Sequence, residues 1–405
     1  MFKSLNFKVI LFGFIFTFFS SFGQSFFLGL FNSSIRDTLS ITHGQFGSIY
    51  ASATLLSSFI LVWIGKKIDD IDILKFASYV VTLLAISCFM FSNVSSVVFL
   101  FFSIFLMRLS GQGLMSHTAT TTIARFFEKS RGRALSTTWL GLSLAEFILP
   151  LLIIFLLTFV DWRNIWIVIS IFVIVVLPIV SFSLVRNIKL DSRETSSIKE
   201  AKTRSKVSLG IFFNSSRLSP LIILFLRLFS ILYKTIRLGT FVYQSFIVSS
   251  KNWGPYVIAQ SFMVYSVLSV ITLFLSGFLI DKFSSRKLLI YMNIPLLFST
   301  FVLYYFNTPI SSFFFLGLIG ISNGLANVLG SATWAEVYGV KYIGSIKALT
   351  TALMVFSTAF GTAFFGILID NSFSIEQIAL VSGSYILVAI SLLFLIKNKL
   401  NPHYL

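Results

Sequence analysis

The sequence predicts an all-α integral membrane protein with twelve transmembrane helices in two six-helix pseudo-symmetric bundles. Composition is the first observation behind this prediction: of 405 residues, 56% are apolar and only 11% are charged, and the mean hydropathy is +0.93. Soluble domains carry about 25% charged residues, so lipid must surround most of this chain. The other two observations are twelve long apolar segments and motifs that recur between the two halves.

The apolar segments each approach the roughly 20 residues that a membrane helix needs. The first follows Lys3 and Lys8 and resembles a signal peptide, but its apolar run is too long and no small-residue cleavage site follows. We therefore expect it to be the first transmembrane helix. The expected spans are residues 8–31, 45–64, 74–92, 96–124, 133–157, 162–186, 218–248, 255–280, 287–306, 310–335, 344–369 and 376–397.

The distribution of basic residues predicts the orientation of the chain. With a cytoplasmic N-terminus, 24 of the 31 Lys and Arg residues fall in cytoplasmic segments and 3 fall in outer loops. Cytoplasmic loops of membrane proteins carry such an excess of positive charge. We therefore expect a plasma membrane protein, in the bacterial inner membrane, with both termini in the cytoplasm. The net charge of +17 then reflects topology and does not indicate a nucleic-acid partner.

The chain divides at its longest polar loop. We expect an N-terminal bundle at 1–186, a basic cytoplasmic linker at 187–217 and a C-terminal bundle at 218–405. Motifs recur at an offset of 212 residues, and the matched pairs are Gly65 with Gly277, Asp69 with Asp281, and Gly132 with Gly344. Repeats related by an axis along the membrane normal are typical of transporters.

The loop motif in each half carries a family resemblance. Residues 277–287 read GFLIDKFSSRK, close to the G-x-x-x-D-[RK]-x-G-x-[RK]-[RK] signature of the major facilitator superfamily, with Ser284 in place of the glycine. The first-half copy keeps Gly65 and Asp69 but has acids at positions 70 and 72. Residues 108–113, RLSGQG, resemble the family's R-x-x-x-G-x-G pattern, with one residue fewer between the arginine and the first glycine.

The chain thus resembles this superfamily over nearly its whole length, and in particular its bacterial monocarboxylate and organic-anion carriers. The resemblance implies secondary transport by alternating access, with one central site between the bundles. It also implies that the loop motifs gate the cytoplasmic side. The expected gating residues are Gly65, Asp69, Gly277, Asp281 and Arg286.

Two charged residues deep in the first half suggest a coupling site. Arg108 lies near mid-depth of the fourth span, and Glu146 is the only carboxylate deep within a span. A charge at the bilayer centre costs about 2.5–3.5 kcal/mol, so each is a functional candidate. Because the two lie on neighbouring helices, we expect them to pair and to exchange a proton as substrate arrives. A permanent structural ion pair is the alternative.

The seventh span carries three cations on one helix face. Arg227, Lys234 and Arg237 are spaced seven and three residues apart, which returns each to the same face. Like charges need a counter-charge, and one glutamate cannot neutralise four cations. We therefore expect an anionic substrate bound by Arg108, Lys234 and Arg237, while Arg227 could instead extend to the cytoplasmic surface.

Polar side chains on the central helices could complete the substrate site. The candidates are Gln24, Tyr233, Tyr243, Gln244 and Asn323, which would add directional hydrogen bonds to an apolar pocket. Hydrogen bonds between helices are the alternative role for each.

Several function classes find no support in the sequence. It has no phosphate-binding G-x-x-x-x-G-K-[ST] loop, no H-E-x-x-H metal motif, and one cysteine, Cys88. We expect no cofactor, no metal and no enzymatic activity. The expected function is secondary transport of a small organic anion, proton-coupled or by exchange, by a single chain in lipid. A drug or metabolite exporter of the same fold and a non-translocating sensor are the alternatives.

Overall fold

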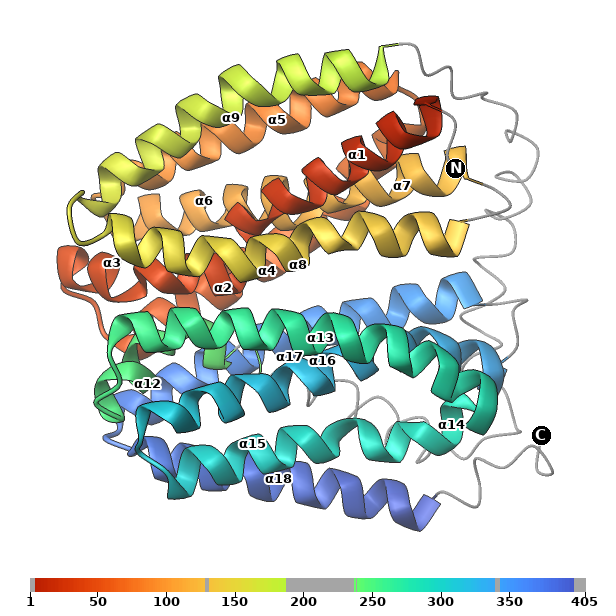
Figure 1. Cartoon of the computed structure of the whole chain (residues 1–405). Helices are drawn as coiled ribbons and strands as arrows, with labels where there is room; N and C mark the ends of the chain where they lie inside the picture. The colour runs from red at the N-terminus through yellow and green to blue at the C-terminus, as the bar shows by residue number, and fades with distance from the viewer. Residues whose placement is uncertain (1–3, 128–130, 187–236, 238, 339–342, 397–405) are drawn as a thin grey trace.

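The computed structural model is almost entirely helical and forms two bundles (Figure 1). It describes residues 4–127, 131–186, 237 and 239–338, and then 343–396. The predicted linker and most of the seventh predicted span, including Tyr233 and Lys234, lie outside these residues. Helix α1 (Ser4–Phe19) begins and α18 (Ile375–Ile396) ends at one end of the molecule, whereas α3 (Asn32–Leu39) and α12 (Gln244–Ser250) lie at the opposite end (Figure 1). We refer to these as the linker end and the α3 end.

Long helices make up the N-terminal bundle. They are α1 (Ser4–Phe19), α4 (His43–Lys66), α5 (Ile73–Ser92), α6 (Val97–Met107), α7 (Ser116–Phe126), α8 (Arg131–Leu156) and α9 (Trp162–Val185). The short α2 (Ser25–Leu28) and α3 (Asn32–Leu39) continue α1. Within the bundle, α1 packs on α8 and α5 packs on α9.

Long helices also make up most of the described part of the C-terminal bundle. Its helices are α12 (Gln244–Ser250), α13 (Pro255–Phe283), α14 (Ser285–Leu288), α15 (Ile294–Tyr305), α16 (Pro309–Tyr338), α17 (Ile343–Asp370) and α18 (Ile375–Ile396). Here α13 packs on α16 and α15 packs on α18.

Among the described residues, nine helices are long and apolar enough to cross a membrane, and a bent pair is a tenth. The eleventh predicted span corresponds to α17, of which Val355–Asp370 is counted as a shorter apolar helix. With the seventh predicted span, this agrees with twelve spans in two bundles and confirms the predicted fold class.

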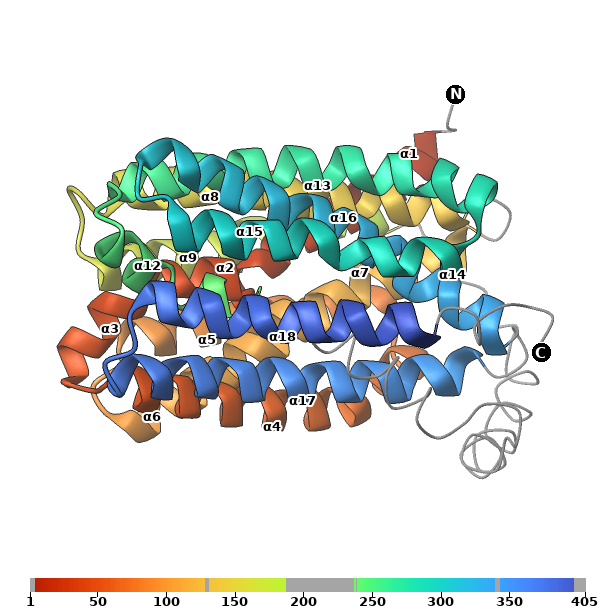
Figure 2. The same ribbon diagram turned by 90° about the horizontal axis from the view of Figure 1, so that it is seen from below.

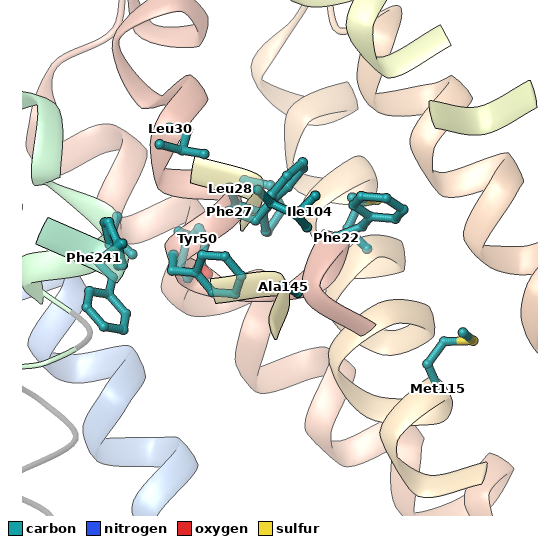
Figure 3. Packing of buried hydrophobic residues seen from close by; sticks show 14 of the residues in the cluster. Phe22, Phe27, Leu28, Leu30, Tyr50, Ile104, Met115, Ala145 and Phe241 are labelled. Atoms are coloured by element: carbon teal, nitrogen blue, oxygen red, sulfur yellow. The ribbon is translucent and has the colours of Figure 1, made fainter. Parts of the chain in front are cut away.

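The bundles meet along two helix pairs. Figure 2 shows α17 running along α4 on one side of the interface and α13 along α8 on the other. A single cluster of buried hydrophobic residues extends across both bundles, and Figure 3 shows part of it, including Phe241, Tyr50 and Ala145. Buried hydrophobic residues of the two bundles therefore pack against one another at this interface, as Phe26 and Phe262 do.

The first predicted span, expected as one transmembrane helix over 8–31, is interrupted in the structure. The helical parts Phe7–Gly23 and Ser25–Leu39 meet at 42°. Gln24 is extended, with φ −84° and ψ 152°, and this interrupts the ladder of backbone hydrogen bonds. Backbone groups freed at such a break need other partners inside a membrane. The break therefore creates polar groups at the centre of the protein.

Candidate functional site

Arg108 donates a hydrogen bond to a backbone carbonyl group that the break in the first span leaves free. Its Nη1 donates to the Gly23 carbonyl oxygen at 3.0 Å and to Ser25 Oγ at 3.2 Å. The Tyr50 ring lies 5.3 Å from its guanidinium carbon, and the Tyr50 hydroxyl donates to Ser25 Oγ at 2.9 Å. The side chain is buried, and its Nε has no hydrogen-bond partner among the described residues. All these partners are neutral.

A π-helical segment, Arg108–Met115, presents this arginine. Such wide turns are uncommon and are frequent at functional sites. Gly111 in this segment faces Gly23, so that a methyl group at Gly111 would come within 2.6 Å of the Gly23 nitrogen. The two irregular segments thus touch through their backbones, which brings Arg108 within reach of the Gly23 carbonyl.

Glu146 pairs with Arg237 of the opposite bundle. Their closest atoms, Oε1 and Nη2, are 3.5 Å apart, and 5% of the Glu146 side chain is exposed against 23% for Arg237. This corrects the expected Arg108–Glu146 pair: among the described residues, Arg237 is the ion-pair partner found for Glu146. Helix spacing in the first half could not reveal a partner supplied by the second half.

The helix around Glu146 is locally weakened. Pro150 lies four residues later within α8, and a proline cannot donate to the carbonyl four residues before it. The turn that carries Glu146 therefore lacks one backbone hydrogen bond. This allows α8 to bend where its only deep carboxylate faces the other bundle.

Asn323 and two aromatic rings hold the Arg237 guanidinium. Arg237 Nη1 donates to Asn323 Oδ1 at 2.5 Å, and Asn323 Nδ2 donates to Ser269 Oγ at 2.7 Å. The guanidinium carbon lies 5.1 Å from the centre of the Phe241 ring and 5.7 Å from that of Tyr265. Cations are attracted to aromatic faces at such distances. This arrangement fixes Arg237 at the interface between the bundles.

The other predicted substrate residues lie elsewhere. Tyr243 donates its hydroxyl to the carbonyl oxygens of His43, at 3.1 Å, and Thr362, at 2.9 Å. Gln244 donates to the Phe26 carbonyl oxygen at 2.9 Å. Gln24 sits at the break and is partly buried. In the structure, Tyr243 and Gln244 therefore make contacts between the bundles at the α3 end.

Serine and aromatic residues that the sequence did not single out as ligands support both arginines. Ser25 and Tyr50 hold Arg108, while Ser269 and Phe241 hold Asn323 and Arg237. Isolated serines in apolar spans were the available signal, but such residues usually bond to their own helix.

Arg286, a predicted gating residue, binds Glu336 at the linker end. Arg286 Nε donates to Glu336 Oε1 at 2.8 Å, and the Ser284 and Ser285 hydroxyl groups also donate to this carboxylate. Glu336 lies beyond the apolar stretch Pro309–Leu329. Partial burial raises its pKa, but the hydrogen bonds from Ser284, Ser285 and Arg286 outweigh it and lower the pKa to about 2.

The remaining gating candidates are only partly described. The Gly65 carbonyl oxygen accepts a hydrogen bond from His117 Nε2 at 3.0 Å. A methyl group at Gly277 would meet no described atom within 4 Å, so packing does not require glycine there. The side chains of Asp69 and Asp281 lie outside the description, and their gating contacts stay predictions.

This fold, with buried charges at a bundle interface, is that of a membrane transporter. The sequence model of the Major Facilitator Superfamily matches residues 13–245 and again residues 236–404, and the chain belongs to this family. No curated protein matches it by sequence.

Solved structures share the fold at low sequence identity. The nucleoside transporter NupG has a TM-score of 0.74 at 14% identity, and the match covers 97% of this chain and 99% of NupG. The D-xylose-proton symporter has a TM-score of 0.74 at 14% identity, and the match covers 96% of this chain and 98% of the symporter. A bacterial homolog to the human lysosomal transporter Spinster has a TM-score of 0.72 at 12% identity, and the match covers 97% of this chain and 96% of the homolog.

Proposed function

We propose that this chain is a secondary transporter of a small organic anion, driven by a proton gradient or by exchange. The balance of buried charge carries the proposal. Glu146 offsets Arg237, whereas Arg108 is buried among neutral partners in the described part of the chain. A buried cation without a counter-ion is costly in a membrane. A bound anion would remove this cost.

The Glu146–Arg237 pair offers a coupling step. A substrate carboxylate can replace Glu146 as the partner of Arg237, because both present the same acceptor group. Glu146, once displaced, would be an unpaired carboxylate in an apolar surrounding, where the neutral acid is the stable form. Substrate binding would then be tied to uptake of one proton. Lys234 and Tyr233 remain proposed substrate ligands from the sequence.

A neutral polar substrate is the second candidate. The Glu146–Arg237 pair cancels its own charge and offers both donors and acceptors. Two proteins of similar fold, the nucleoside transporter NupG and the D-xylose-proton symporter, are named for neutral polar compounds. A substrate of that kind would bind beside the pair without displacing it.

The test is uptake into proteoliposomes under an imposed proton gradient. The panel is labelled lactate, pyruvate, a dicarboxylate, a sulfonate, a sugar phosphate, uridine, D-xylose and an organic cation. Anion uptake that rises with an inward proton gradient and is lost in Arg108→Gln supports the proposal. Uptake of uridine or xylose alone selects the second candidate, and uptake of the cation alone selects an exporter. Binding without flux selects a sensor.

Glu146→Gln separates coupling from translocation. This variant keeps the size of the side chain but cannot exchange a proton, so we expect anion counterflow to persist while proton-driven accumulation falls at least about tenfold. Glu376→Gln is the matched control, because Glu376 pairs with Lys251 at 2.8 Å within the C-terminal bundle. Accumulation by Glu146→Gln equal to that of this control would contradict the coupling role.

A further inference from the structure

The α3 end of the molecule carries a set of hydrogen bonds that join the two bundles. We propose that Asn32, Tyr243, Gln244 and Asp370 form a gate, here called the α3-end closure, which must open once in each transport cycle. The proposal rests on the proposed function for its role in transport. None of these contacts involves the loop motifs that were predicted to gate the linker end.

Two amide side chains form a reciprocal pair across the closure. Asn32 Nδ2 donates to the Val242 carbonyl oxygen at 2.7 Å, and Gln244 Nε2 donates to the Phe26 carbonyl oxygen at 2.9 Å. Positions 32 and 244 are 212 residues apart, the offset of the sequence repeat. Both side chains are buried. Each half thus receives a hydrogen bond from the other half, and the two donors occupy equivalent positions of the repeat.

Asp370 adds a second connection between the bundles. Its carboxylate oxygens accept from the backbone nitrogens of His43, at 3.0 Å, and Gly44, at 2.8 Å. These are the first residues of α4, whose amide groups have no partner within their own helix. The last residue of α17 in one bundle therefore caps the first turn of α4 in the other. Tyr243 extends the contact by donating to the His43 carbonyl oxygen.

Glycine permits the closest approach in this region. Gly29 is helical, with φ −64° and ψ −23°, so its own backbone does not require glycine. A methyl group there would overlap the Phe241 carbonyl oxygen of the other bundle. The three atoms nearest to this methyl group all belong to the other bundle, to Phe241 and Gln244, so alanine would collide with the closed partner. It is therefore a wedge against the closure.

The contacts of the closure differ in strength, so variants that remove different contacts should open it to different extents. The Asp370 carboxylate is exposed, and such carboxylates at helix N-termini shift an equilibrium about two- to fivefold. The buried amide pair and the Gly29 contact act where water is excluded, so their loss should shift the equilibrium further from the closed to the open form. Graded opening across these variants is the signature expected of a gate.

Distances between spin labels test the closure without any substrate. In a Cys88→Ala background, labels at Thr38 and Ser250, both exposed, report the distance between the bundles at the α3 end. Labels at Thr38 and Ser95 report a distance within one bundle. We expect Asp370→Ala to raise the long-distance population about two- to fivefold, and Gly29→Ala to raise it more, with the second distance unchanged.

Two matched controls accompany these variants. Asp161→Asn removes a carboxylate that caps α9 within one bundle, through its bond to the Arg163 nitrogen at 2.9 Å. Gly254→Ala adds a methyl group with its nearest neighbour at 3.9 Å. Distances in Asp370→Ala and Gly29→Ala that match these controls would overturn the gate. Opened distances in a protein that transports nothing in the panel would retain the gate and reject the transport proposal.

Discussion

At Asn323 the two ends of one amide hold two different groups. The oxygen accepts from Arg237 and the nitrogen donates to Ser269. Close contact between α13 and α16 makes this possible, since a methyl group at Gly324 would lie 2.5 Å from the Ser269 carbonyl oxygen. We infer that Asn323 positions Arg237, whereas the sequence suggested direct substrate contact. An orienting partner of this kind reduces the freedom of a long cationic side chain.

Asn323→Ala should raise the KM for the transported anion about tenfold with little change in kcat. The reason is the loss of a charge-assisted hydrogen bond to Arg237, worth roughly 1.5–3 kcal/mol. Ser269→Ala, one step further from the arginine, should change KM in the same direction but less. Initial uptake rates over a concentration series measure both. A large effect of Asn323→Ala with none from Ser269→Ala would favour direct substrate contact instead.

The irregular elements, rather than the regular helices, bring the Arg108 site together. The break after Gly23 frees a carbonyl group, and the π-helical segment carries the arginine that binds it. Gly111 lets the two elements meet. Small residues at helix contacts allow such approach in membranes.

Gly111→Ala should destabilise the protein by about 1–3 kcal/mol, because the added methyl group meets rigid backbone at Gly23. Gly113→Ala is the matched control on the same segment. Its methyl group would meet the Leu61 side chain at 3.1 Å, and a side chain can move. Thermal unfolding in detergent compares the two. Equal midpoints for both variants would show that the backbone contact does not limit stability.

The short helix α14 depends on one carboxylate at the linker end. Glu336 of α16 accepts from the backbone nitrogen of Ser285 at 3.0 Å as well as from Arg286. Partial burial raises its pKa, but side-chain hydrogen bonds from Ser284, Ser285 and Arg286 outweigh this effect and lower the pKa from 4.5 to about 2. A depressed carboxylate pKa stabilises the folded state above pH 4.5, and this contribution is lost as the pH falls from 4.5 towards 2.

Glu336→Gln should therefore lower the thermal midpoint by a few degrees at pH 7, a loss on the order of 1–2 kcal/mol after screening by solvent. The difference in thermal midpoint between the parent protein and Glu336→Gln should shrink below pH 4.5, since the parent alone loses this stabilisation. Unfolding scans from pH 7 to pH 3 measure it. A gap that stays constant over this range would exclude the carboxylate's ionisation as its cause.

For the whole molecule, composition and repeats were enough to predict two bundles of membrane helices. Apolar runs determine which segments span a membrane, whatever their neighbours. The partner of Glu146 could not be predicted, because Arg237 lies 91 residues further along the chain in the other bundle. The break at Gln24 was also missed, since no proline marks it. Contacts between bundles depend on how the bundles dock, which periodicity within one helix does not specify.

Charge at the two ends of the molecule predicts its orientation. The three basic residues assigned to outer loops all have protein partners at the α3 end. Arg36 donates to Asn32 at 2.8 Å, Arg163 to the Ser92 and Val94 carbonyl oxygens, and Lys251 to Asn307 and Glu376. These cations have structural roles there, so the excess of basic residues at the linker end remains the topological signal.

We therefore expect the α3 end to face outward and both termini to face the cytoplasm. In a Cys88→Ala background, a cysteine at Ser250 should react with a membrane-impermeant maleimide added to intact cells. A cysteine at Asp70, which is exposed in the loop between α4 and α5, should react only after the membrane is permeabilised. The reverse labelling pattern would show that the protein has the opposite orientation in the membrane. The α3-end closure would then face the cytoplasm, and the Glu336 contact would face the outside.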